Sequence, residues 1–166
     1  MLKAFILTLV ASVAWNQQQL ETVYNPQKNL TTVRLPLQKL SGAKDRYHSL
    51  SFAIDYSYPG RTPARPEHVN FELTSVVKAR RLNTDLYVLF VADGKPMHFS
   101  SNRSAIRNPV RGRSWIGEKM VFLIPREEFL KLAAAEKLAI KMGGVTFEFS
   151  DELRDKVRQF AEGIGR

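Results

Sequence analysis

The chain has 166 residues, of which 44% are hydrophobic, a size that fits one domain with a core of its own. Twenty-five Lys and Arg stand against sixteen Asp and Glu, and the net charge of +9 favours acidic partners such as an acidic glycan, a lipid headgroup or an acidic protein. Cysteine is absent, which excludes a disulfide framework, a thiol nucleophile and any metal centre held by cysteine.

The first residues, MLKAFILTLVASVAWNQQQ, have the pattern of a secretory signal peptide. Lys3 gives a basic start, residues 4–14 are an apolar run, and Ser12-Val13-Ala14 is a cleavage site of the small-x-small kind. The run is too short to span a membrane, so we predict a signal peptide over residues 1–14 and no transmembrane span after its removal. The protein is then exported, to the periplasm or outside the cell, and the lack of cysteine favours a bacterial source.

Residues 15–29 are polar and predict a tether, after which residues 30–166 form a single β-rich domain. Three early runs alternate between apolar and polar side chains, which is typical of half-buried strands. They are Val33 to Leu37, Leu50 to Tyr56, and Val69 to Val77. A connection with three prolines, residues 58–66, separates the second run from the third.

The second half continues with strands and adds two helices. Leu86 to Ala92 predicts a central strand, Asp93-Gly94 a tight turn, and Lys95 to Ser100 the returning strand. A further strand begins near Trp115, and Pro125 opens a short helix.

A second hairpin follows, because residues 138–142 and 145–149 alternate on either side of Gly143-Gly144. Ser150 is a suitable N-cap for a terminal helix. The apolar stripe of this helix consists of Leu153, Val157, Phe160, Ala161 and Ile164. Together these elements predict a β-rich (α+β) fold, namely an antiparallel β-sandwich or open barrel of about eight strands with a short helix and a C-terminal helix.

Two stretches of the C-terminal half also resemble known sequences. They are DLYVLFVADGK, at residues 85–95, and MVFLIPREEFLKLAAAEKLAIKMGGVTFEFSDELRDKVRQFAEGI, at residues 120–164. Both look like small exported bacterial proteins of unknown function, in which a strand, a short helix, a hairpin and a terminal helix follow in that order. The resemblance implies a fold and carries no catalytic or binding residue.

The strongest candidate site is the stretch RSAIRNPVRGR, at residues 103–113. Pro109 and Gly112 exclude a helix, so the stretch predicts a long loop, and residues 94–117 contain no acidic side chain. The planar guanidinium of arginine holds carboxylate or phosphate through two hydrogen bonds, which makes the stretch a candidate anion site. Its residues are Arg103, Arg107, Arg111 and Arg113. The alternative is a solvated loop, since runs of charged residues commonly form solvated faces.

No catalytic residue, metal site or cofactor is predicted. His48, His68 and His98 fall in separate strand-like segments, and Asp55 and Glu72 lie on polar faces of their strands. We therefore expect a non-enzymatic exported domain that binds or scaffolds an envelope partner, with the arginine stretch as the contact. One alternative is a hydrolase that acts on glycan or peptide, and another is a cytoplasmic binder of polyanions or nucleic acid that keeps its N-terminus. Nucleic acid is not the expected partner, since few aromatic residues lie among the arginines. The oligomeric state is left open.

Overall fold

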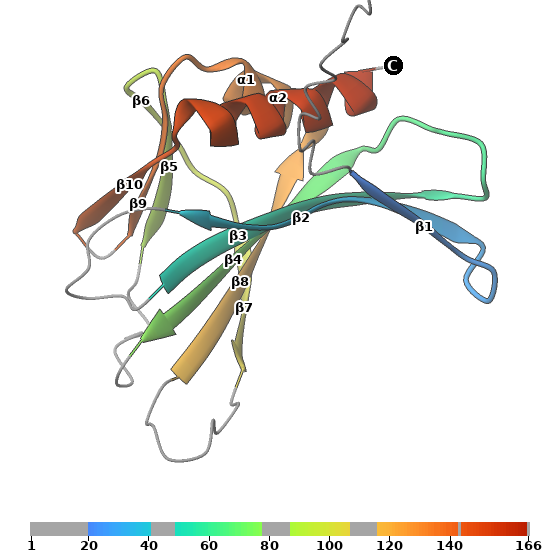
Figure 1. The fold of residues 1–166 in the computed structure, drawn as a ribbon, viewed down its shortest axis with the longest axis horizontal. Coiled ribbons are helices and arrows are strands. Elements are labelled where there is room, and N and C mark those ends of the chain that lie inside the picture. Colours follow the sequence, from blue (N-terminus) through green and yellow to red (C-terminus); the bar gives the residue numbers. More distant parts are fainter. Residues whose placement is uncertain (1–19, 41–48, 78–86, 107–115, 143, 166) are drawn as a thin grey trace, which may run out of the picture.

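The computed structural model describes residues 20–40, 49–77, 87–106, 116–142 and 144–165, and their fold is drawn in Figure 1. Ten strands and two helices lie in these ranges. In chain order they are β1 (Glu21–Asn25), β2 (Leu30–Leu40), β3 (Ser49–Pro59), β4 (His68–Val77), β5 (Val88–Ala92), β6 (Lys95–Met97), β7 (Ser101–Ile106), β8 (Ile116–Pro125), α1 (Arg126–Ala134), β9 (Leu138–Met142), β10 (Val145–Glu148) and α2 (Asp151–Gly165).

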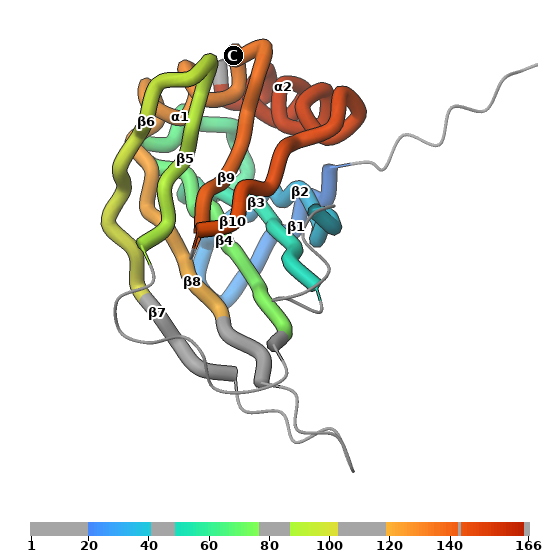
Figure 2. The backbone as a smooth tube through the Cα atoms, turned by 90° about the vertical axis from the view of Figure 1, so that its left-hand side faces the viewer, coloured from blue at the N-terminus to red at the C-terminus, as the bar shows by residue number. Residues whose placement is uncertain are grey.

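The strands form two antiparallel sheets that pack against each other. The large sheet has the order β1-β2-β3-β4-β8-β7, and the small sheet has the order β10-β9-β5-β6. Figure 2 shows the chain passing from β6 straight into β7, which joins the two sheets along one side. Within the described residues neither sheet closes on itself, so the predicted β-rich, sandwich-like fold is confirmed. Ten strands replace the eight expected, and β1 and β7 are the two that were missed.

Strand β1 corrects the prediction of a polar tether over residues 15–29. Residues 21–25 pair with β2, while residues 1–19, which include the predicted signal peptide, lie outside the described part of the chain. A turn over residues 26–29 connects β1 to β2, with Asn29 in the left-handed region at a φ of 47°. The strand was missed because nearly all of its side chains are exposed, so no apolar alternation marks it.

Aromatic rings from both sheets form the centre of the core. Phe90 of β5 is fully buried, and its ring meets the rings of Phe71 and Phe122 edge to face, with centroids 5.0 and 5.1 Å away. Phe71 and Phe122 belong to β4 and β8 of the large sheet, so these contacts cross from sheet to sheet. Phe71 also stacks on Phe52 of β3 at 5.3 Å. Phe90 is therefore a central side chain in the packing of the small sheet on the large one, beside the buried Ile140, Met142 and Phe147.

Both helices begin where the sequence predicted. Pro125 occupies the N-cap position of α1, and the Oγ of Ser150 accepts a hydrogen bond from the backbone N–H of Leu153 in α2 at 3.4 Å. Every member of the predicted apolar stripe of α2 is buried against the large sheet and α1. Among the described residues, no helix has both the length and the apolar character needed to cross a membrane.

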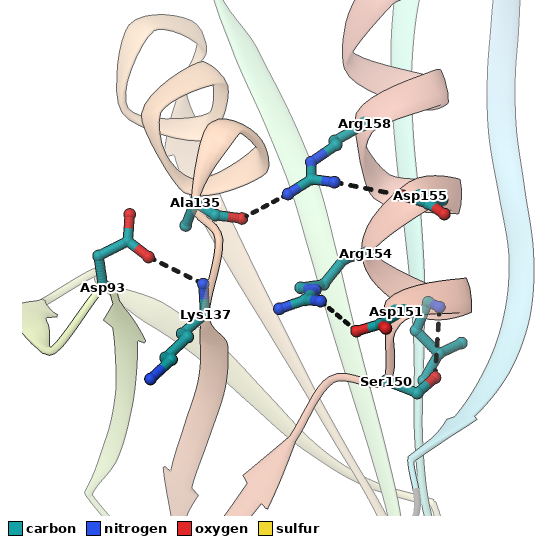
Figure 3. A network of polar contacts seen from close by, with 9 residues as sticks. Asp93, Ala135, Lys137, Ser150, Asp151, Arg154, Asp155 and Arg158 are labelled. Carbon is teal, nitrogen blue, oxygen red and sulfur yellow. Dashed lines mark hydrogen bonds and ion pairs between the residues drawn. The ribbon is translucent and has the colours of Figure 1, made fainter.

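Figure 3 shows polar contacts within α2, one contact that joins α2 to the end of α1, and one that joins the β5–β6 turn to the segment before β9. Arg158 donates to the carbonyl oxygen of Ala135 at 3.0 Å, just beyond the end of α1, and pairs with Asp155 at 3.2 Å. The carboxylate of Asp93 accepts a hydrogen bond from the backbone N–H of Lys137 at 2.8 Å. That bond ties the β5–β6 turn to the segment before β9. These contacts stabilise the fold, so we do not assign their residues to a binding site.

A bulge in β2 fixes the other side of α2. The pairing of β2 with β3 shifts register between Leu35 and Gln38, which turns the Gln38 side chain into the interior, where only 4% of the residue is exposed. The Gln38 amide donates to the carbonyl of Pro36 at 2.8 Å and accepts from Lys156 of α2 at 3.1 Å. A buried polar side chain is thereby satisfied by the helix that covers it.

One glycine in a turn and one in a helix give a first testable prediction. Gly94 follows Asp93 in the β5–β6 turn with a φ of +78°, whereas Gly163 lies in helix α2 with open space where a Cβ would be placed. Changing Gly94 to alanine should lower the free energy of unfolding by about 1 to 2 kcal/mol, because alanine is strained at positive φ. Changing Gly163 to alanine should raise it by about 0.5 to 1 kcal/mol. Urea denaturation measures both changes, and equal signs would contradict the assigned backbone conformations.

Candidate functional site

One end of the large sheet collects the ends of five neighbouring strands. We call it the basic end, after the basic segments that are joined to it. It lies toward the lower left in Figure 1. The paired residues at this end are Leu40 with Leu50, Ser49 with Val76, Val77 with Ile116, and Ile106 with Gly117. Three connecting segments of the chain, residues 41–48, 78–86 and 107–115, therefore leave from or return to the same end of one sheet.

These three segments carry most of the net charge. They lie outside the described residues, but their sequence holds eight basic and two acidic side chains, a net charge of +6. The basic side chains are Lys44, Arg46, Lys78, Arg80, Arg81, Arg107, Arg111 and Arg113. By contrast, the described residues hold fifteen basic and fourteen acidic side chains and are almost neutral. The basicity of the protein thus belongs to the segments joined at the basic end.

The predicted arginine loop is shorter than the sequence suggested. Residues 101–106 form β7, in which Arg103 pairs with Met120 of β8, so the prediction of a loop beginning at Arg103 is wrong. The polar residues Ser101, Asn102 and Ser104 hid the strand, because no apolar alternation marks them. Arg107, Arg111 and Arg113 lie outside the described residues. Since Ile106 pairs with Gly117, the stretch that carries them connects β7 to β8 at the basic end.

The outer face of the large sheet, which points away from the small sheet, carries a polar row that sequence reasoning found only in part. Glu72 of β4 pairs with Lys119 of β8 at 2.6 Å and with Arg34 of β2 at 3.9 Å. Asp55 of β3 accepts a hydrogen bond from Asn70 of β4 at 2.9 Å. Both carboxylates singled out in the sequence are thus engaged in cross-strand contacts. Such contacts stabilise a sheet and do not require a ligand.

The described histidines lie apart from the basic end. His68 is the first residue of β4, and His98 follows β6, where its ring contacts the ring and hydroxyl of the exposed Tyr87. His48 lies outside the described residues. In the part of the chain that the structure covers, no three His, Asp or Glu side chains come together in a way that could hold a metal ion.

Two hollows flank Leu123 on the outer face, at the end opposite to the basic end. One has a volume of about 590 Å³ and lies between Leu123, the segment after β6 and the first turn of α1; the other, of about 470 Å³, lies between Leu123, the end of β3 and the proline-rich connection before β4. Both linings mix apolar and polar side chains, with Glu128 in the first hollow and both Arg65 and Glu67 in the second. No chemical class of ligand is selected by such a lining.

Comparison with known proteins adds no family to this geometry. No family model, no curated protein and no solved structure matches the chain. The resemblance to small exported bacterial proteins therefore stays a prediction.

Proposed function

We propose that this protein is an exported binding domain that holds an extended anionic polymer, of the acidic-glycan type, at the basic end of its large sheet. The observation that carries the proposal is the strand register. Because β2, β3, β4, β8 and β7 all end together, segments that are far apart in the sequence are joined to one edge of the fold. With eight basic and two acidic side chains, these segments carry six of the nine net positive charges of the chain.

The spacing of the strands favours a polymer over a single small anion. Neighbouring strands lie about 4.8 Å apart, so the five strand ends cover about 19 Å from β2 to β7. A ligand with charges repeated along its length meets all three segments at once, whereas one phosphate or carboxylate meets only one. Binding of this kind releases counterions and depends on the number of charges paired.

One feature of the sequence supports export, and one feature of the structure favours binding over hydrolysis. Export rests on the apolar leader and its cleavage site at residues 1–14, and an exported domain meets envelope glycans or lipid headgroups before it meets nucleic acid. The hydrolase alternative gains no specific support, since Asp55 and Glu72 are occupied by Asn70, Lys119 and Arg34. Binding rather than hydrolysis is therefore the function proposed.

The proposal is tested with heparin, a linear sulfated polysaccharide, as the probe. Isothermal titration at low salt should give measurable binding to the protein lacking residues 1–14. Changing Arg103, Arg107, Arg111 and Arg113 together to glutamine should weaken that binding by at least about tenfold, because a large share of the paired charge is removed. Inorganic phosphate at the same total charge should not displace the polymer.

The matched control removes four positive charges elsewhere. Lys28, Lys95, Lys131 and Lys137 are exposed and lie away from the basic end, and their joint change to glutamine leaves the same net charge. This control variant should keep most of the affinity. If both variants lose affinity equally, binding follows the overall charge and the basic end is not a site. The thermal midpoint of the control variant should stay close to that of the unchanged protein, since its four exposed charges contribute little to folding.

A further inference from the structure

We propose that the outer edge of β1 is a self-association surface, at which two copies of the chain pair antiparallel and continue the large sheet across a twofold axis. This inference goes beyond the proposed function and does not rest on it. Strand β1 stands at the end of the order of the large sheet, and among the described residues only β2 pairs with it. Its outer backbone N–H and C=O groups can be satisfied by another extended strand.

The four sheet edges differ in how well they are protected. Strand β6 has three residues, including Lys95 and Pro96, β7 carries Arg103, and β10 has only four residues. Proline and positive charge on an edge are the usual means of preventing strand addition. Strand β1, with the sequence ETVYN, has neither, and Val23 at its centre is the most exposed of the large hydrophobic side chains described, at 62%.

The sequence of β1 is compatible with pairing to itself. In an antiparallel pair centred on Val23, Val23 meets its own copy, Thr22 meets Tyr24, and Glu21 meets Asn25. No like charges are opposed, and the two valines bury apolar surface that is open to solvent in the single chain. The strand that we propose to add at this edge is therefore β1 of a second copy and not an unrelated peptide.

The neighbouring part of β2 limits the register of this contact. Beyond Arg34, the last residue paired with β1, the edge of the sheet continues with Pro36 and the bulge at Gln38. Proline offers no N–H, and the bulge interrupts the ladder, so an added strand is confined to the five residues of β1. An edge contact of this size buries little surface, and we expect a weak dimer with a Kd on the order of 100 µM.

Charge and position also suit a dimer at this edge. Strand β1 pairs with residues 30–34, at the end of β2 away from Leu40, and it lies on the opposite side of the molecule from the small sheet (Figure 1). The basic ends of two paired copies therefore point away from each other, so their repulsion is small.

The chain has no cysteine, so single-cysteine variants test the register directly. Val23→Cys should form a disulfide-linked dimer on mild oxidation, because directly opposed residues of an antiparallel pair come within reach of that bond. Lys28→Cys, in the exposed turn next to β1, is the control and should cross-link much more slowly. Equal rates for the two variants would overturn the proposal.

Sedimentation velocity supplies the second measurement. The unchanged protein should shift from monomer toward dimer as its concentration rises through about 100 µM, and Val23→Lys should abolish the shift without changing the circular dichroism spectrum or the thermal midpoint. Leu37→Lys, which alters a side chain 53% exposed on β2, should leave the shift in place. A protein that stays monomeric over this range, or a dimer that survives Val23→Lys, would show that β1 is not the contact.

Discussion

Replacing Phe90 by alanine should lower the free energy of unfolding by about 3 to 5 kcal/mol, the cost of removing a fully buried aromatic side chain and leaving a cavity. The loss of stability is expected to lie in the upper part of this range. Phe90 touches Phe71 and Phe122 of the large sheet and Phe99 of the β6–β7 connection with its ring. Phe71 and Phe122 cannot move into the space without separating from their own strand neighbours.

Urea denaturation of the variant, followed by fluorescence and by circular dichroism, measures the loss. Leu123→Ala is the control, since Leu123 is 54% exposed on the outer face and its removal should change stability by less than about 0.5 kcal/mol. The two probes should report one transition. A loss below about 1 kcal/mol for Phe90→Ala would mean that the small sheet is not packed on the large one as described.

Salt concentration should have a large effect on the affinity for heparin. Raising the salt concentration from about 50 to about 200 mM should weaken heparin binding by up to about 100-fold if four charge contacts are made, because each contact adds about 0.9 to the slope of log affinity against log salt for a dense polyanion. A sparser glycan should give a smaller slope. Titration at four or five salt concentrations measures it.

The variant without Arg103, Arg107, Arg111 and Arg113 separates this effect from general charge. Its slope should be flatter than that of the unchanged protein, whereas the lysine control should keep the original slope. An affinity that does not respond to salt at all would mean that apolar contacts hold the polymer, which would contradict the basic end as the site.

Much of the fold could be predicted because its strands are half-buried. In β3, Leu50, Phe52, Ile54 and Tyr56 are buried, and the alternation that they create is visible in the sequence. The turns at Asp93-Gly94 and Gly143-Gly144 were visible for the same local reason, since Gly94 and Gly144 both have positive φ. Strands β1 and β7 lack this signal, because β1 buries almost nothing and the first four residues of β7, SNRS, are all polar or charged.

The geometry of the candidate site could not be predicted from local patterns. Residues 41–48, 78–86 and 107–115 are basic in the sequence, but nothing in their spacing indicates that they leave from one end of a sheet. That juxtaposition depends on β8 pairing with β4 and β7 pairing with β8, which are long-range contacts. The cross-strand partners of Glu72, namely Arg34 and Lys119, were missed for the same reason.

The pairing of β4 with β8 has a consequence for how the chain acquires its structure. Strands β1 to β4 are neighbours in both sequence and space, so each can pair as soon as the next has been made. The β4–β8 ladder instead joins residues that are far apart, from Val77 with Ile116 to His68 with Pro125. Closing such a large loop slows folding, and until it closes the free edge of β4 is open to pairing with other chains. A newly made chain therefore stays prone to aggregation until the residues of β8 have left the ribosome.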